Sequence, residues 1–339
     1  MDYVQMLQLK KMKICFAFGL LIFSSGCQNL PTTLVAKLMD NQQTRENVQY
    51  LEQYAKENIN QQLIIKTDLN YGDQSSQRLD IIYPEVLVDQ KIPVVFLVHG
   101  GGWVAGNKES MLPYAKMIAD QGFLVVNVEY TLVPQAAYPQ QVLELNQAVE
   151  YVVQHQNQLP IDLSRVFFSG DSAGANITSS YVAALNAPKM AEQLNLKASI
   201  SAQSVKGLVL HSGDYDLKTL YHSSAKAGKI VSWGAQSVIA QYSGYPHPKD
   251  QQLDLMSAYP WVTAQFPPVY FSATDQDILT QTQTKPLVKK LKNLGVDVSS
   301  KIYAKDYAEN INHDFNFNMR FKASHEVFDQ SIQFLKRHS

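Results

Sequence analysis

One serine in this sequence has neighbours that are typical of a catalytic nucleophile, with a glycine two residues before it and another two residues after it. Ser172 lies in "GDSAG", between the apolar run "RVFFS" and the helix-like pattern "ANITSSYVAAL". Small residues around a serine at a strand-to-helix junction allow a tight turn that lifts its hydroxyl oxygen above a sheet. The pattern predicts a nucleophile, and the alternative is a serine that only caps the helix.

Three consecutive glycines, Gly100, Gly101 and Gly102, follow a second apolar run, "IPVVFLVH", and precede a tryptophan. Glycines in a row usually mean that the backbone must come close to something. A bound phosphate is disfavoured, because the Lys-Ser/Thr pair of a P-loop and the second glycine cluster of a dinucleotide site are both missing. Backbone N–H groups that bind a developing oxyanion fit a serine nucleophile better.

A serine nucleophile needs a base, and the base needs a carboxylate to orient it. Asp275 and Asp277 follow the apolar run "PPVYFSAT", and His313 follows "KIYA" within "KDYAENINHDF". The order Ser, Asp, His is the one that a serine hydrolase with a strand-to-helix nucleophile uses. Side-chain alternation does not distinguish the two aspartates. For His313 the alternative is an ordinary histidine of a surface loop.

The elements that must position these residues follow from the hydrophobic pattern. From about Leu63 onward, short apolar runs alternate with helix-length segments, which is typical of βαβ units and a mostly parallel sheet. Several runs are apolar on both faces, as strands between two helical layers are. The expected strands cover residues 78–84, 92–100, 123–130, 165–170, 205–212, 267–274 and 296–304. The expected helices cover residues 111–122, 140–156, 173–187, 284–295 and 325–338.

Two segments depart from this alternation. Residues 213–266 are rich in Tyr, Ser and Gly and are interpreted as an inserted cap over the sheet. A helix over about 41–60 can pack beside that cap, so residues 28–62 form an N-terminal helical segment before a catalytic domain of residues 63–339. Several aromatic residues can either line an apolar pocket or serve plain packing, namely Trp103, Tyr130, Trp233, Tyr242 and Tyr245.

From roughly Tyr71 to the C-terminus, the chain resembles the hormone-sensitive-lipase-like carboxylesterases of the α/β-hydrolase fold. The matching motifs are "HGGGW", "NVEYTLVPQAAYP", "GDSAGAN", "DQDIL" and "NHDF". The resemblance implies a mostly parallel central sheet flanked by helices, with an inserted cap. It also implies a nucleophile, an acid, a base and three oxyanion-binding amides, which are Ser172, Asp277, His313 and the N–H groups of Gly101, Gly102 and Ala173.

The same resemblance favours Asp277 over Asp275, because relatives leave room for the strand to end and the chain to turn before the acid. Asp275 is then a turn or capping group. Asp314 stands where many members of the family have glycine after the histidine. Other stretches, "YGDQSSQRLDIIYP" and "GGGWVAGNKES", are similar to arylformamidase-like members of the superfamily.

The N-terminus has the pattern of an export signal. Lysines precede the apolar run "ICFAFGLLIF" and the small residues of "SSGC". This run is shorter than the roughly 20 residues of a membrane span. Residues 1–27 resemble a bacterial lipoprotein signal, which implies that Cys27 is lipidated, and Gln28 after it points by the same resemblance to the outer membrane. The alternative is an ordinary cleaved signal and a periplasmic or secreted protein.

Composition excludes other classes of function. The 29 Lys and Arg residues nearly balance the 30 Asp and Glu residues, and the main body of the chain has no basic run, so no nucleic-acid partner is expected. No zinc-binding spacing is present, and neither a metal nor a cofactor is expected. Both cysteines, Cys15 and Cys27, fall in the signal segment, so no disulfide is expected inside the folded domain.

The sequence therefore predicts a serine carboxylesterase that hydrolyses small or medium esters through an acyl-enzyme. An arylformamidase-like amide hydrolase would use the same residues, and a hydrolase-fold binding protein without catalysis is the alternative from another class. A small-molecule ester is the expected partner, and contact with a membrane is expected only through a lipid on Cys27. The oligomeric state is left open.

Overall fold

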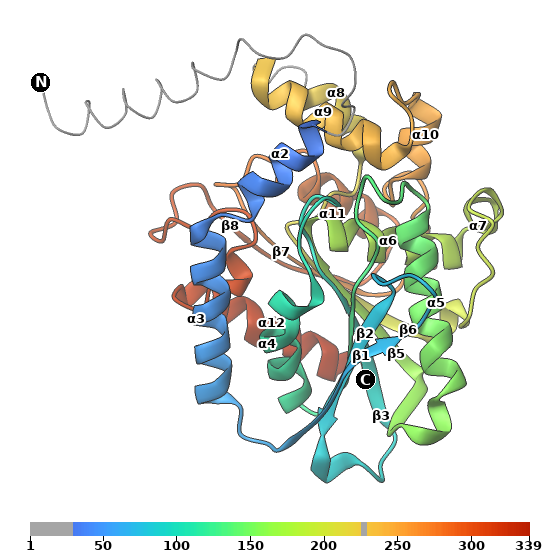
Figure 1. Cartoon of the computed structure of the whole chain (residues 1–339), viewed down its shortest axis with the longest axis vertical. Coiled ribbons are helices and arrows are strands. Elements are labelled where there is room, and N and C mark those ends of the chain that lie inside the picture. Colours follow the sequence, from blue (N-terminus) through green and yellow to red (C-terminus); the bar gives the residue numbers. More distant parts are fainter. Residues whose placement is uncertain (1–29, 225–228) are drawn as a thin grey trace, which may run out of the picture. The chain divides into compact units, whose positions relative to one another are not determined.

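Eight strands form a mostly parallel sheet in the computed structural model, which describes residues 30–224 and 229–339 (Figure 1). Their spatial order is β1-β2-β4-β3-β5-β6-β7-β8. β2 runs antiparallel to both of its neighbours, β1 and β4, and the six strands from β3 to β8 run parallel to one another. The strands are β1 (Leu63–Asn70), β2 (Arg78–Pro84), β3 (Ile92–Val98), β4 (Leu124–Val128), β5 (Ile161–Asp171), β6 (Val205–His211), β7 (Val269–Thr274) and β8 (Val298–Tyr303).

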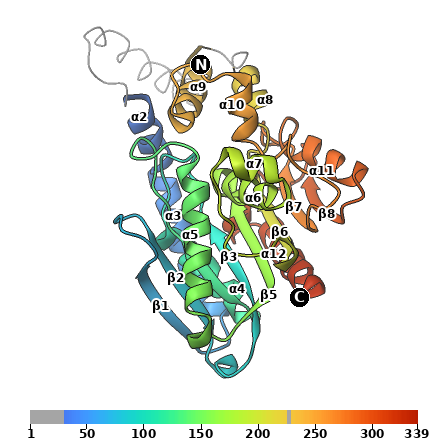
Figure 2. The ribbon, with the colours of Figure 1, turned by 90° about the vertical axis from the view of Figure 1, so that its right-hand side faces the viewer.

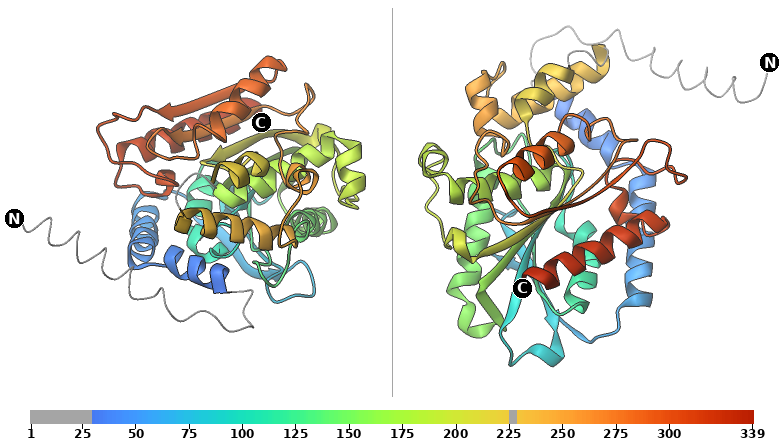
Figure 3. Two further views of the ribbon diagram at one scale, coloured as in Figure 1. Left: turned by 90° about the horizontal axis from the view of Figure 1, so that it is seen from above. Right: turned by 180° about the vertical axis from the view of Figure 1, so that it is seen from behind.

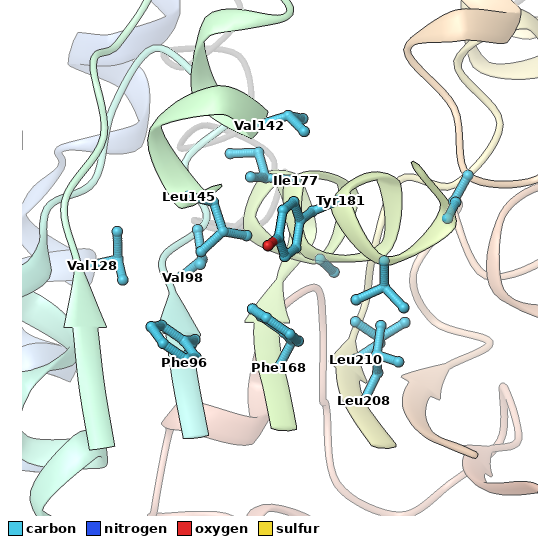
Figure 4. Packing of buried hydrophobic residues seen from close by; sticks show 14 of the residues in the cluster. Phe96, Val98, Val128, Val142, Leu145, Phe168, Ile177, Tyr181, Leu208 and Leu210 are labelled. Carbon is cyan, nitrogen blue, oxygen red and sulfur yellow. The ribbon is translucent and has the colours of Figure 1, made fainter. Parts of the chain in front are cut away.

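Helices cover both faces of the sheet, which is why the central strands are apolar on both sides. Val95 and Leu97 of β3 face α3 (Gln42–Asn58), α4 (Lys108–Asp120) and α12 (Lys322–His338). Phe96 and Val98 face the opposite layer, of α5 (Gln140–Gln154), α6 (Ser172–Asn186), α7 (Pro188–Gln193) and α11 (Thr284–Asn293). Figure 4 shows this second layer, with Phe96 and Phe168 side by side beneath Leu145 and Tyr181. Burial of these apolar side chains between the sheet and the two helical layers stabilises the fold.

The described residues of the predicted insertion include three helices, α8 (Leu217–Ser224), α9 (Lys229–Ser243) and α10 (Asp250–Leu255). They lie together beyond the carboxyl end of the sheet (Figures 2 and 3). A short helix, α2 (Leu30–Met39), lies at the same end, whereas α3 packs chiefly against α4. Residues Pro31–Ser339 form one compact unit, so these helices and the sheet belong together.

The seven expected strands are confirmed as β2 to β8, and the expected helices are present with small shifts of their ends. The sequence did not predict β1, because its residues are mostly exposed and its pairing with β2 is interrupted between Lys66 and Leu69. The proposed signal of residues 1–27, with Cys27, lies outside the described residues. Within the described ranges, no helix is both long and apolar enough to cross a membrane.

Candidate active site

Ser172 lies at the sharp turn between β5 and α6. Its φ of +48° is one that residues other than glycine adopt rarely, and the turn leaves no room for side chains on either side. A Cβ on Gly170 would lie 2.5 Å from the carbonyl carbon of Gly174, and a Cβ on Gly174 would lie 2.1 Å from the carbonyl oxygen of Val98. The two glycines of "GDSAG" are therefore required by backbone packing, and the packing holds the serine in a strained conformation.

The glycine loop after β3 runs beside this turn. The N–H of Gly100 donates to Oδ1 of Asp171 at 3.0 Å, which ties the loop to the residue before the serine. Gly101 and Gly102 have positive φ values of +113° and +56°. Within the described chain, neither of their N–H groups donates a hydrogen bond to a protein acceptor. The loop thus offers free donors beside the start of α6, where Ala173 lies.

The two glycines are needed for different reasons. A Cβ on Gly101 would lie 2.0 Å from the carbonyl oxygen of Ala105, so the turn excludes any side chain there. A Cβ on Gly102 would meet only the side chain of Met39, at 3.6 Å. At Gly102 it is therefore the positive φ that favours glycine. Met39 belongs to α2, so this N-terminal helix covers the loop, a contact that the sequence did not reveal.

His313 joins the serine to a carboxylate. It lies in the long loop between β8 and α12, and its Nε2 is 2.9 Å from Oγ of Ser172. On the other side of the ring, Nδ1 is 2.7 Å from Oδ2 of Asp277, which is 7% exposed and follows β7. Because a carboxylate only accepts, the proton of a neutral ring lies on Nδ1 and Nε2 can accept from the serine. The structure brings together the three side chains that the sequence singled out.

Asp275, the other aspartate of "TDQDIL", turns away from the histidine. Its carboxylate pairs with Nζ of Lys285 at 2.8 Å and accepts a hydrogen bond from Gln281 at 2.9 Å. The backbone N–H of Asp277 donates to the carbonyl of Thr274, so the chain turns between the two aspartates. This turn is why one carboxylate reaches His313 and its neighbour does not.

Two further carboxylates, which the sequence did not mark as site residues, lie near His313. Asp214 follows β6, is 5% exposed and has an Oδ1 without a hydrogen-bond partner in the described chain. Asp314 follows the histidine itself, and its Oδ2 is 3.3 Å from Nε2. Desolvation raises the pKa of each of these carboxyl groups to about 6, and the negative charge of Asp277 adds to the shift. Among the described residues, no group of His, Cys, Asp and Glu is arranged to hold a metal ion.

Buried contacts connect the cap to this site. Trp103 stacks on Tyr242 of α9, with ring centroids 4.3 Å apart, and the hydroxyl of Tyr242 donates to Oδ1 of Asn176 at 3.2 Å. Nδ2 of Asn176, on α6, donates to the carbonyls of Asp214 and Met256. Tyr130 packs on His99, so it also serves packing. The remaining aromatic candidates are exposed, at 46% for Trp233 and 51% for Tyr245.

Comparison with known proteins gives consistent results. Residues 79–291 match the model of the BD-FAE family. An esterase from Gibberella moniliformis is 25% identical over 261 residues, which cover 75% of this chain and 77% of that protein. A protein from Arabidopsis thaliana, named as a probable isoprenylcysteine alpha-carbonyl methylesterase, is 25% identical over 246 residues. That match covers 70% of this chain and half of the plant protein.

A solved structure, esterase B from Lactobacillus rhamnosis, has the same fold. It superposes with a TM-score of 0.75 at 19% sequence identity, over 91% of this chain and 95% of that one. The α/β-hydrolase fold predicted from the motifs is confirmed.

Proposed function

Since the chain belongs to the BD-FAE family, we propose that it is a serine carboxylesterase that hydrolyses small or medium carboxylic esters. Both relatives compared above are named as esterases, which favours esters over amides as substrates. The observation that carries the proposal is the continuous line of hydrogen bonds from Ser172 through His313 to Asp277. A binding protein without catalysis would not need this arrangement.

Acylation begins with attack of the serine on the ester. Oγ of Ser172 forms a bond to the carbonyl carbon while its proton moves to Nε2 of His313, 2.9 Å away. The carbonyl oxygen becomes an oxyanion, and the N–H groups of Gly101, Gly102 and Ala173 are the proposed donors to it. The proton on Nε2 then passes to the alkoxy oxygen as the ester C–O bond breaks, so a neutral alcohol leaves.

Deacylation repeats these steps with water. A water molecule gives one proton to Nε2 of His313 as its oxygen attacks the acyl carbon. Collapse of the second tetrahedral intermediate returns that proton to Oγ of Ser172 and releases the carboxylic acid. Throughout, Asp277 holds the ring by its Nδ1 and stabilises the imidazolium that forms in each half-reaction. The chain's own residues account for every proton in the cycle.

The test is a covalent label combined with turnover. A fluorophosphonate should add one mass to the peptide that carries Ser172, and Ser172→Ala should lose both the label and hydrolysis of a short nitrophenyl ester. Ser180→Ala is the matched control, because Ser180 lies on the same helix and its buried hydroxyl has no partner in the described chain. A drop of only about tenfold in kcat for Ser172→Ala would contradict the assignment, because loss of a nucleophile costs far more.

We also propose that the protein is exported and that a lipid on Cys27 anchors it, at the periplasmic side of the outer membrane. The charged and apolar pattern before "SSGC" supports this. So do the exposed side chains of Leu34 (48%) and Leu38 (66%) on α2, which begins three residues after Cys27. Cys27→Ser should move the enzyme from the membrane fraction to the soluble fraction. A native N-terminal peptide that begins elsewhere and carries no acyl mass would end this proposal.

A further inference from the structure

Asp314 occupies an unusual place for a carboxylate in a serine esterase site. Its Oδ2 is 3.3 Å from Nε2 of His313, the nitrogen that must accept the proton of Ser172. The side chain is 27% exposed, while Oδ1 is buried and has no hydrogen-bond partner in the described chain. The residue has a positive φ of +55°, which aspartate tolerates better than most side chains. The fold therefore does not explain why this residue is an aspartate, because its side chain makes no structural hydrogen bond and its backbone conformation does not need a carboxylate.

Two carboxylates contact the imidazole of His313, and the charge of a third acts on it. Asp277, after β7, binds Nδ1, Asp314 lies at Nε2, and Asp214, after β6, adds its charge from nearby. In the part of the chain that the structure describes, none of the three pairs with a lysine or an arginine. His313 is therefore the positive partner that the geometry offers them. Asp171 is also buried, and desolvation, followed by the negative charge of Asp314, raises the pKa of its carboxyl group to about 8.

The contact at Nε2 decides which protonation state is favoured. In a neutral ring with its proton on Nδ1, a lone pair on Nε2 faces the lone pairs of an ionised Asp314, which is repulsive. A proton on Nε2 turns the same contact into attraction between opposite charges. Desolvation lowers the pKa of His313, but the charges of Asp314, Asp277 and Asp214 outweigh it and raise the pKa to about 10.

We propose that Asp314 is a second carboxylate of the proton-transfer machinery, which holds positive charge on Nε2 of His313 from the side opposite Asp277. The proposal rests on the function proposed above and deepens it. In the transition state, Asp314 stabilises the imidazolium and so strengthens the base. In the resting enzyme the same charge favours a proton on Nε2, and a protonated ring cannot accept the proton of Ser172.

Removal of the Asp314 charge should raise kcat/KM at low pH, where it frees more neutral His313, and lower kcat/KM at high pH, where it weakens the base. The enzyme is active only in the fraction with neutral His313, so kcat/KM rises with pH through the raised pKa of that ring. Removal of the Asp314 charge lowers this pKa and moves the rise to lower pH. Above the rise, the variant is slower, since its base is weaker. Its rate profile must therefore cross that of the native enzyme.

The experiment is a pH profile of kcat/KM with a nitrophenyl ester for the native enzyme, Asp314→Asn and Asp314→Gly. Asn and Gly both tolerate a positive φ, and Gly adds no donor that could occupy Nε2. Asp306→Asn is the matched control, since Asp306 is an exposed carboxylate of the same loop. We expect the rise to move down by at least about one pH unit in both variants, which increases the neutral fraction of His313 about tenfold at pH values below it. There the variants should be faster than the native enzyme, by about tenfold divided by the factor by which their alkaline plateau is lower. At the alkaline plateau they should be slower.

Two results would overturn the proposal: an unchanged pH for the rise, or variants that are slower by one factor at every pH. The second would mean that Asp314 serves the fold alone. A failure of the proposed esterase function is recognised separately, since it would leave the native enzyme without ester hydrolysis or without a fluorophosphonate label on Ser172. Labelled, active enzyme with an unmoved rise contradicts only the role of Asp314.

Discussion

The two sides of the candidate site are built by different means. On the serine side, backbone packs against backbone, since a Cβ on Gly170, Gly174 or Gly101 would overlap main-chain atoms. On the histidine side, side chains meet by charge and hydrogen bonding, and His313, Asp277, Asp314 and Asp214 come from three loops. The serine side thus depends on the absence of side chains, and the histidine side depends on their charges.

This difference predicts which property a substitution changes first, the stability of the fold or the rate of the reaction. Substitutions of Gly170, Gly174 or Gly101 should act first on the fold, because they insert atoms where the backbone leaves no space. Substitutions of the carboxylates on the histidine side should act first on proton transfer, because they change the charges around the imidazole of His313. The distinction would be wrong if a glycine substitution on the serine side lowered the rate without lowering stability. It would also be wrong if a charge substitution on the histidine side lowered stability first.

The largest effect is expected on the histidine side, at Asp277. Asp277→Asn keeps the size of the side chain but presents an amide to Nδ1, which favours the wrong tautomer of His313 and removes the charge that stabilises the imidazolium. In a related triad this replacement costs about 10⁴ in kcat. We expect a similar loss here, with a melting temperature close to that of the native protein. Asp275→Asn, two residues away, should keep most of the activity, because Asp275 pairs with Lys285 instead. The reverse pattern would move the role to Asp275.

The next effect is expected on the serine side, at Gly174. Gly174→Ala would place a Cβ 2.1 Å from the carbonyl oxygen of Val98, so α6 must shift away from β3. We expect a loss of roughly 3 kcal/mol in the free energy of unfolding, measured by urea denaturation. Gly234→Ala is the control, because a Cβ on Gly234 in α9 meets nothing within 4 Å and should stabilise the helix slightly. Equal stability of the two variants would show that the turn can relax.

The same difference explains what the sequence revealed. Glycine packing leaves a local pattern, so "HGGGW" and "GDSAG" predicted the serine side residue by residue. The order of strands and the residue types also led to His313 and to the pair Asp275 and Asp277, and the resemblance to the esterase family favoured Asp277. Asp214 was not predicted as a member of the site, because its role depends on its closeness to His313, which lies about 100 residues later in the sequence. Asp314 is next to His313 in the sequence, but only the folded loop shows that its carboxylate turns back toward Nε2 of the ring. Met39 was missed for the same reason, since only the folded chain places α2 over Gly102.

The smallest effect concerns the cost of the carboxylates to stability. Burial raises the pKa of Asp214 to about 6, above its value near 3.8 in an unfolded chain, so ionisation of this group opposes folding. The penalty is absent below about pH 4, grows between about pH 4 and 6, and stays constant above, at most about 3 kcal/mol.

Asp214→Asn removes the penalty but leaves an amide that also lacks partners. The amide cost is the same at every pH, so it cancels when two pH values are compared. We therefore expect the melting temperature of Asp214→Asn, relative to that of the native protein, to be higher at pH 8 than at pH 4. Asp306→Asn, whose carboxylate lies in solvent, should show no such change. If the melting temperature of Asp214→Asn differs from that of the native protein by the same amount at pH 4 and at pH 8, the carboxylate of Asp214 has a partner in solution. Its ionisation then does not oppose folding.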